Sequence, residues 1–334
     1  MPRPLLKMTA LSVCLAVAIA PNVSAQPRQD VKIQWSMGQS SGKPTARHES
    51  AAAIVDGKLY LIGGRGDRPL DILDLASGQW RTGSRPPVEI NHTQAVTLDG
   101  RIYVIGAFSD PFPQENIVPQ ILIYDPVADS WTQGAALPAG RHRGGAGVVV
   151  HDGHIYLVAG NRLGHNSGFV PWLDRFDPKT DAWTALADAP RPRDHFHAIV
   201  LDGKIYAAGG RKSAADQKQP LALTIPEMDI YDIAADRWTT AAAPIPTPRA
   251  GVSVVTVGKL VVVMGGESGV QVPAHAEVEA YDPAKGSWTT LTPLPVGRHG
   301  MQAVQVGNRV HVLVGSGNRG GGPELNDHWV MSGF

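Results

Sequence analysis

Four arginines and one glutamate hold similar places in the sequence, each directly after a glycine turn. They are Arg65, Arg162, Arg211, Arg319 and Glu267. A guanidinium group can bind a carboxylate or a phosphate through two parallel hydrogen bonds. If these side chains meet at one mouth of the fold, the pattern predicts a site for a small anionic ligand. The alternative is that they are solvated loop arginines that share no site.

A second set of candidates breaks the regularity of the chain. Residues 193–197 read Arg-Asp-His-Phe-His, and the period of two along a strand places His195 and His197 on one face. Two imidazoles so placed can share a metal ion. Because no cysteine and no carboxylate cluster accompany them, we expect no metal and no other cofactor. Arg193 and His195 remain ligand-binding candidates, as does Trp172, whose indole either stacks on a sugar ring or packs against the fold beneath it.

The elements that must position these residues come from an internal repeat. The motif Asp-Gly-Lys-Leu-Tyr at 56–60, followed by Gly63-Gly64, returns five more times with variations. A tryptophan recurs every 45 to 55 residues, at Trp35, Trp80, Trp131, Trp183, Trp238 and Trp288. A proline-rich stretch after each tryptophan ends at Arg47, Asn91, Arg141, Arg193, Arg249 or Arg298. Six copies in one register predict six equivalent structural units.

Each unit has the pattern of four short strands. The runs 51–55 and 58–62 are joined by Asp-Gly, a two-residue hairpin signal, and two further runs follow. With 37 glycines and 27 prolines, the chain turns too often for a helical bundle. One such meander cannot bury both of its faces, whereas six around an axis can. We predict an all-β fold, a six-bladed β-propeller with four-stranded antiparallel blades.

The ends of the repeat predict how the ring closes. After Gly315 there is sequence for one more strand, about residues 326–331, so the sixth unit lacks its tryptophan strand. Trp35, in the run 31–36, precedes the first unit and has no blade of its own. We therefore expect this N-terminal strand to complete the last blade and so to remove two sheet edges.

Strand direction then assigns the loops to faces. The loops between the second and third strands are long and unlike one another, and they share a face with the connections between blades. They cover about residues 65–70, 107–119, 161–171, 211–226, 267–275 and 317–325. Variable loops on a rigid scaffold predict that a ligand or partner binds on this face. The recurring arginine, followed by His48, His92, His142 and His299, either lines the mouth or bonds loop carbonyls between blades.

The glycine doublet, the spaced tyrosine and the tryptophan, at about 50 residues per repeat, resemble the kelch family over essentially the whole chain after the first 25 residues. The resemblance implies a propeller that binds proteins or glycans. The kelch family also includes enzymes. Galactose-oxidase-like chemistry needs a cysteine-linked tyrosine, and the sole cysteine, Cys14, lies in the first 25 residues. The iron-binding pattern of plant specifier proteins is not found.

Exported sialic-acid mutarotases are also six-bladed kelch proteins, and the resemblance to them implies an arginine and a glutamate at the mouth. In this chain Arg211 would bind the carboxylate of the sugar, and Glu267 would move the anomeric proton. Three functions remain open: binding without catalysis, catalysis on an acidic sugar such as N-acetylneuraminate, and a purely structural role in an envelope complex. The sequence therefore does not decide whether the protein is an enzyme.

Composition and the N-terminal sequence predict the cellular location and the class of partner. Arg3 and Lys7 precede an apolar run and a small-residue site at 23–25, which predicts a signal peptide over residues 1–25 and a single propeller over 26–334. We expect a periplasmic or secreted protein without stable membrane insertion. The chain has thirty basic and thirty acidic residues, so it has no net positive charge whose electrostatic field would attract nucleic acid. The expected partner is a small molecule, a glycan or a protein.

Overall fold

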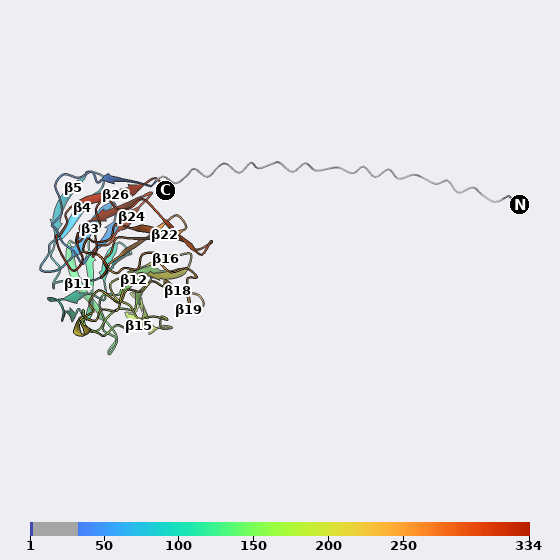
Figure 1. Ribbon diagram of the computed structural model, residues 1–334, viewed down its shortest axis with the longest axis horizontal. Coiled ribbons are helices and arrows are strands. Elements are labelled where there is room, and N and C mark those ends of the chain that lie inside the picture. The colour runs from blue at the N-terminus through green and yellow to red at the C-terminus, as the bar shows by residue number, and fades with distance from the viewer. Residues whose placement is uncertain (3–32) are drawn as a thin grey trace. The chain divides into compact units, whose positions relative to one another are not determined.

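The structure, a computed structural model, describes residues 1–2 and 33–334 (Figure 1). The expected signal peptide, apart from its first two residues, and the sole cysteine, Cys14, lie outside the described residues. Among the described residues, no helix combines the length and the apolar character that a membrane crossing requires.

Residues 33–334 form six four-stranded antiparallel sheets, the blades of a propeller, as predicted. Blade 1 consists of β2 (Ser50–Val55), β3 (Lys58–Gly63), β4 (Leu70–Asp74) and β5 (Gln79–Gly83). Blade 2 consists of β6 (Ala95–Leu98), β7 (Arg101–Val104), β10 (Gln120–Asp125) and β11 (Ser130–Ala136). Blade 3 consists of β12 (Gly147–His151), β13 (His154–Val158), β14 (Leu173–Asp177) and β15 (Ala182–Ala185).

The second half of the ring repeats this arrangement. Blade 4 consists of β16 (His197–Leu201), β17 (Lys204–Ala208), β18 (Asp229–Asp232) and β19 (Arg237–Thr240). Blade 5 consists of β20 (Ser253–Val257), β21 (Leu260–Met264), β22 (Val278–Asp282) and β23 (Ser287–Thr290). Blade 6 consists of β24 (Val304–Val306), β25 (Arg309–Leu313), β26 (His328–Ser332) and β1 (Gln34–Met37). The loops add a small ribbon, β8 (Phe108–Ser109) with β9 (Asn116–Ile117), and one 3₁₀ turn, η1 (Ala215–Gln217).

The predicted closure of the ring is confirmed. Strand β1 pairs antiparallel with β26 and places Trp35 opposite Met331. The Trp35 indole N–H donates to the Thr292 carbonyl, 3.1 Å away, in the chain that follows blade 5. The N-terminal strand thus carries the tryptophan that the sixth repeat lacks, and it removes the free edge of β26.

The repeated aromatic residues join neighbouring blades. In blade 2 the Tyr124 and Trp131 rings pack 5.1 Å apart, and the Trp131 indole donates to the Ser84 carbonyl that follows blade 1. The tryptophans of blades 3, 4 and 5 donate in the same way to a carbonyl at or just after the end of the preceding blade. Apolar side chains on the facing surfaces of adjacent blades fill the space between them, for example Tyr60 of blade 1 and Tyr124 of blade 2. The interface between blades is therefore the main core.

The first strand of each blade lines a central channel of about 350 Å³. Two glutamines satisfy backbone groups across it. Gln94 accepts from the N–H groups of Val148 and Ala198, and Gln302 accepts from those of Ala52 and Ala95. These bonds tie inner strands of different blades and close the channel beneath the loop face.

The recurring arginine is structural in every blade that has it. Arg47 donates to the Gly63 carbonyl at 2.9 Å and pairs with Asp71 at 2.5 Å, both in blade 1. Arg193, Arg249 and Arg298 make equivalent bonds to carbonyls and a carboxylate of their own blades. Each guanidinium group is buried and faces the blade. The hypothesis that these arginines line the mouth, and with it the ligand-binding role assigned to Arg193, is wrong.

The register of this position also differs from the expectation in two blades. In blade 3 the buried arginine that bonds Ala159 and Leu157 is Arg143, not Arg141. In blade 2 the place is held by Ile90, whose carbonyl accepts from Gly64 as the Arg193 carbonyl accepts from Gly160. His92 therefore stands one place later in its blade than the sequence comparison assumed.

Candidate functional site

A closed ring of backbone hydrogen bonds surrounds the axis at the loop face. The second residue after each structural-arginine position bonds its counterpart in the next blade: His92 N–H to the Glu49 carbonyl, Gly145 to His92, His195 to Gly145, Gly251 to His195 and Gly300 to Gly251. The ring residues are thus Glu49, His92, Gly145, His195, Gly251 and Gly300. The N–H of Ser50, the residue after Glu49, donates to the Gly300 carbonyl at 3.2 Å and closes the circuit onto blade 1. Each ring residue has a positive φ.

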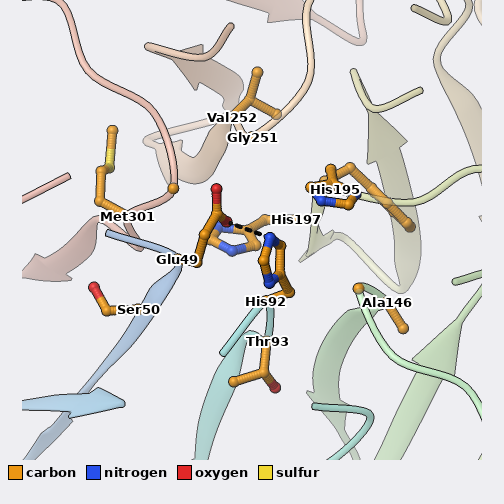
Figure 2. A pocket seen from close by; sticks show the side chains of 13 residues that line it. Glu49, Ser50, His92, Thr93, Ala146, His195, His197, Gly251, Val252 and Met301 are labelled. Carbon is orange, nitrogen blue, oxygen red and sulfur yellow. Dashed lines mark ion pairs between the residues drawn. The ribbon is translucent and has the colours of Figure 1, made fainter. Parts of the chain in front are cut away.

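Three of these ring positions carry side chains in spite of that backbone. Glu49, His92 and His195 have φ values of 55°, 51° and 54°. A residue with a side chain pays about 1–2 kcal/mol for this conformation, and glycine does not. Blades 3, 5 and 6 show that glycine fits the ring. The strained residues are therefore best explained by what their side chains do. All three line one small space, and Figure 2 shows the Glu49 carboxylate and the His92 ring directed toward each other there.

Above the ring lies a cavity of about 620 Å³, formed by the long loops of several blades. Its lining includes carboxylates, arginines, histidines and apolar groups, among them Glu49, Glu89, Asp110, Glu267, Arg65, Arg211, His48, His92, His165, Phe112 and Leu221. A second, much smaller space of about 20 Å³ lies at the ring itself and is lined by Glu49, His92, His195 and His197. The cavity has the size of a small-molecule site.

Arg211 and Glu267 meet on the wall of this cavity. They lie in the long loops of blades 4 and 5, and Arg211 Nη1 is 2.5 Å from Glu267 Oε1. The other oxygen of Glu267 accepts from the Gly320 N–H at 2.6 Å and lies 3.5 Å from His299 Nε2. Burial alone would raise the pKa of Glu267, but the charges of His299 and Arg211 outweigh it and lower the pKa to about 2. Glu267 is therefore ionised, and each of its two carboxylate oxygens has a partner.

His299 lies between two carboxylates. Glu49 Oε1 is 3.3 Å from its Nδ1, and Glu267 is on its other side. Burial opposes the protonated form, yet Glu267 and Glu49 together raise the pKa of His299 above its ordinary value. The same interactions hold the pKa of Glu49 well below its usual range against the effect of burial, with His92 and His299 as the main causes. Buried charges of opposite sign are thus paired across three blades.

Three histidines form a second cluster beside this one. The nitrogens of His92, His165 and His195 lie within 4.8 Å of one another, and all three residues are buried. His165 Nε2 is 2.9 Å from His195 Nε2. Burial lowers the pKa of His165 to about 4 and that of His92 well below its ordinary value. Both of these imidazoles are neutral at pH 7.

Only some of the residues predicted from the sequence reach the cavity. Arg65, Arg211 and Glu267 line it, and His195 lies in the ring beneath it. Arg65 Nη2 is 2.7 Å from Glu115 Oε1, so this arginine too already has a carboxylate partner. His195 and His197 do not pair with each other: His195 contacts His165, whereas His197 begins the inner strand β16. Burial lowers the pKa of His197 to about 4.

Arg162, Arg319 and Trp172 are not among the residues that line the cavity. The residues in register with Arg211 and Glu267 are Asn161 in blade 3 and Ser316 in blade 6, as their bridges to Gly144 and His299 show. Arg319 donates to the Gly269 carbonyl at 2.6 Å. The Trp172 ring lies under the guanidinium groups of Arg141 and Arg162, at 4.7 and 5.6 Å. The indole thus packs on arginines of its own fold.

Sequence reasoning did not select Glu49, His165 or Glu115. Glu49 and His195 hold the same ring position, and that equivalence was the available signal, since the other ring residues are glycines in three blades. His165 and Glu115 come from the irregular loops of blades 3 and 2. No spacing in the sequence relates them to the ring.

The fold and the cavity define a six-bladed propeller with a small-molecule-sized site at its loop face. The family model of the Attractin/LZTR1 beta-propeller matches residues 30–274, and the chain belongs to the kelch-repeat β-propeller family.

Relatives in this family are similar along much of the chain. The Kelch-like protein terF of Aspergillus terreus is 28% identical over 319 residues, which covers 89% of this chain and 68% of that protein. Beta-scruin of Limulus polyphemus is 29% identical over 277 residues, or 78% of this chain but 29% of its own length. The solved structure of YjhT aligns with a TM-score of 0.74 at 16% identity and covers 86% of this chain and 95% of that one. At this identity the match shows a shared fold.

Proposed function

We propose that the protein binds a small sugar-like ligand in the cavity at the loop face. The observation that carries this proposal is the combination, in about 620 Å³, of many hydrogen-bonding groups with the apolar surfaces of Phe112 and Leu221. A sugar ring presents hydroxyl groups at its rim and C–H groups on its faces, so it needs both kinds of wall. Export to the periplasm or the medium, expected from the N-terminal sequence, would expose such a site to extracellular sugars.

The charges in the cavity favour an uncharged or weakly charged ligand over the anion expected from the arginines. Arg65 is paired with Glu115, and Arg211 is paired with Glu267. An anionic ligand would have to displace these carboxylates from the arginines. It would also be repelled by the exposed carboxylates that line the cavity, such as Asp110. The Arg65 side chain, which is 20% exposed, retains donors for the hydroxyl groups of a ligand.

The alternative function is mutarotation of an acidic sugar such as N-acetylneuraminate. It is favoured by the meeting of Arg211 and Glu267 at the cavity wall, the two residues that the mutarotase resemblance selected. In that role Arg211 must release Glu267 to bind the sugar carboxylate, and the freed Glu267, with a higher pKa, would exchange the anomeric proton. Binding of a protein partner on the same face is a third possibility that the kelch relatives support.

Saturation-transfer NMR with single sugars tests the proposal. The panel contains galactose, N-acetylglucosamine, glucuronate and N-acetylneuraminate, and the same samples report the rate of anomer exchange. We expect transfer to a neutral sugar that is lost in Phe112→Ala and retained in Val127→Ala, a matched exposed apolar residue in a turn on the opposite face. Accelerated exchange of N-acetylneuraminate that is lost in Arg211→Ala would select the mutarotase instead. Absence of transfer to any sugar would overturn both and leave a protein partner.

A further inference from the structure

We propose that His92, His165 and His195 form a binding site for one divalent transition-metal ion, with Zn²⁺ as the reference ion. The three side chains come from three different blades or loops: His92 and His195 are ring residues of blades 2 and 4, and His165 lies in the long loop of blade 3. Three imidazoles that converge from separate elements, with one side open to a cavity, match the donor set of sites that leave a fourth position free.

The second nitrogen of each imidazole faces an acceptor. His195 Nδ1 is 2.5 Å from Asp194 Oδ1, and His92 Nδ1 is 2.6 Å from Asn91 Oδ1. His165 Nδ1 is 2.7 Å from Glu115 Oε1, at an angle that departs from a linear hydrogen bond. A carboxylate or carbonyl at Nδ1 holds the proton there and leaves Nε2 as a lone pair, the arrangement found behind metal-bound histidines.

This arrangement creates a conflict that a cation resolves. With both Nδ1 atoms protonated, the Nε2 lone pairs of His165 and His195 point at each other across 2.9 Å in a buried setting. Two acceptors at that distance repel unless a proton or a metal ion lies between them. Ligands of one tetrahedral Zn²⁺, each at about 2.0–2.1 Å, are roughly 3.3 Å apart, so a small movement of either ring admits the ion.

The surrounding charges can accept the ion. Asp194 and Glu115 lie directly behind two of the ligands, and Glu49 Oε2 is 3.4 Å from His92 Nε2. Two arginines oppose the ion. Arg65 lies 3.5 Å from His92 and pairs with Glu115 at 2.7 Å, and Arg211, whose charge acts on His165, pairs with Glu267. The strained backbone of His92 and His195, where three other blades have glycine, gives an independent reason to assign these side chains a role.

The site goes beyond the sugar-binding proposal, because metal binding can be measured with the metal alone. His92 and His165 line the ligand cavity, so a bound ion would place its open position where the oxygen of a ligand can reach it. If the sugar proposal fails, a metal site at the base of the cavity still stands. If the metal proposal fails, sugar binding by protein treated with a chelator is unaffected.

The test is calorimetric titration of the purified full chain, freed of metal with EDTA, with ZnCl₂. Visible absorption after addition of CoCl₂ reports the ligand geometry. We expect one Zn²⁺ per chain and the absorption bands of four-coordinate Co²⁺. His165→Ala and His195→Asn should each weaken binding more than about 100-fold, since each removes a ligand. Asparagine is chosen at 195 because it tolerates the positive φ.

Two further variants separate ligation from surface binding and from misfolding. His154→Ala, at the first residue of β13, should bind Zn²⁺ as the wild type does. Glu115→Gln keeps all three ligands and should weaken binding about 10–100-fold through its loss of the carboxylate behind His165. Near-ultraviolet circular dichroism confirms the fold of each variant. Absence of stoichiometric Zn²⁺ binding in wild type, or equal binding in folded His165→Ala and His195→Asn, would overturn the site in favour of a shared proton.

Discussion

Arg211 and Glu267, on the long loops of adjacent blades, form an ion pair whose two side chains are each 2% exposed. Arg211 Nε also donates to Ser213 Oγ at 3.1 Å, and Glu267 accepts from the Gly320 backbone. The pair therefore links the loops of blades 4, 5 and 6 where the cavity wall is formed. Its charges are compensated inside the protein and not by solvent.

Loss of one member of this pair should be costly. Arg211→Met leaves the Glu267 carboxylate buried without its arginine partner, and we expect the free energy of unfolding to fall by about 3 kcal/mol. The exposed pair Lys259–Asp202 is the matched control, and Lys259→Met should cost less than about 1 kcal/mol. Urea denaturation measures both values. Equal costs for the two variants would show that the cavity-wall pair does not stabilise the fold.

Acid should destabilise the protein through the carboxylates around the cavity. The pKa values of Glu267 and Glu115 are both about 2 against 4.5 ordinarily, because neighbouring cations and hydrogen bonds outweigh burial. A carboxyl whose pKa is lowered in the folded state contributes stability above its unfolded pKa, and that stability is lost as pH falls toward 2.

We therefore expect the free energy of unfolding to fall steadily between about pH 4.5 and 2. Glu115→Gln should reduce this slope by at most about 1.4 kcal/mol per pH unit, the effect of one proton. Urea denaturation at several pH values gives the slope. A variant with the same slope as wild type would mean that Glu115 titrates alike in both states.

The backbone ring should reject side chains where it has glycine. Gly251→Ala combines a φ of +63° with a Cβ 3.3 Å from that of His299, and we expect a loss of about 2 kcal/mol. Gly258→Ala, in a hairpin turn with φ of +59° and open space around its Cβ, measures the backbone cost alone, about 1 kcal/mol. The difference in thermal unfolding between the two variants isolates the crowding at the ring. No difference would argue against a tightly packed ring.

The sequence was sufficient to predict the fold because the repeat imposes it six times. One weak copy would mislead, but the hairpin turns, the tryptophans and the orphan Trp35 agree on blade number, strand order and closure. The assignment of Arg141 to the recurring arginine position was wrong, and this error also came from reliance on the repeat. Blade 3 offers Arg141 and Arg143 two residues apart, and only the bonds to Ala159 and Leu157 identify Arg143 as the repeat position.

The site was less predictable because its residues do not follow the repeat. Arg211 and Glu267 were found through their shared place after the glycine turns. Arg162 and Arg319 were wrongly aligned with them, because the residue that directly follows the glycine turn is Asn161 in blade 3 and Ser316 in blade 6. His165 and Glu115 meet the ring only through the path of two long loops, and that path depends on tertiary packing.

Closure by β1 can be tested by its removal. Deletion of residues 33–37 takes away the Trp35 bond to Thr292 and exposes the edge of β26. Because every blade is stabilised by its two neighbours, we expect tryptophan fluorescence and far-ultraviolet circular dichroism to report one cooperative transition at a clearly lower temperature. A truncated protein that melts like wild type would show that the ring does not depend on this strand.

The most direct measurement of the binding proposal is saturation-transfer NMR of the four-sugar panel with wild type and two arginine variants. Arg65→Ala alters the cavity wall, whereas Arg101→Ala removes an exposed arginine at the first residue of β7 in blade 2. We expect saturable transfer to at least one neutral sugar, weakened in Arg65→Ala and unchanged in Arg101→Ala. Transfer to no sugar in the panel, or equal transfer in both variants, would contradict it.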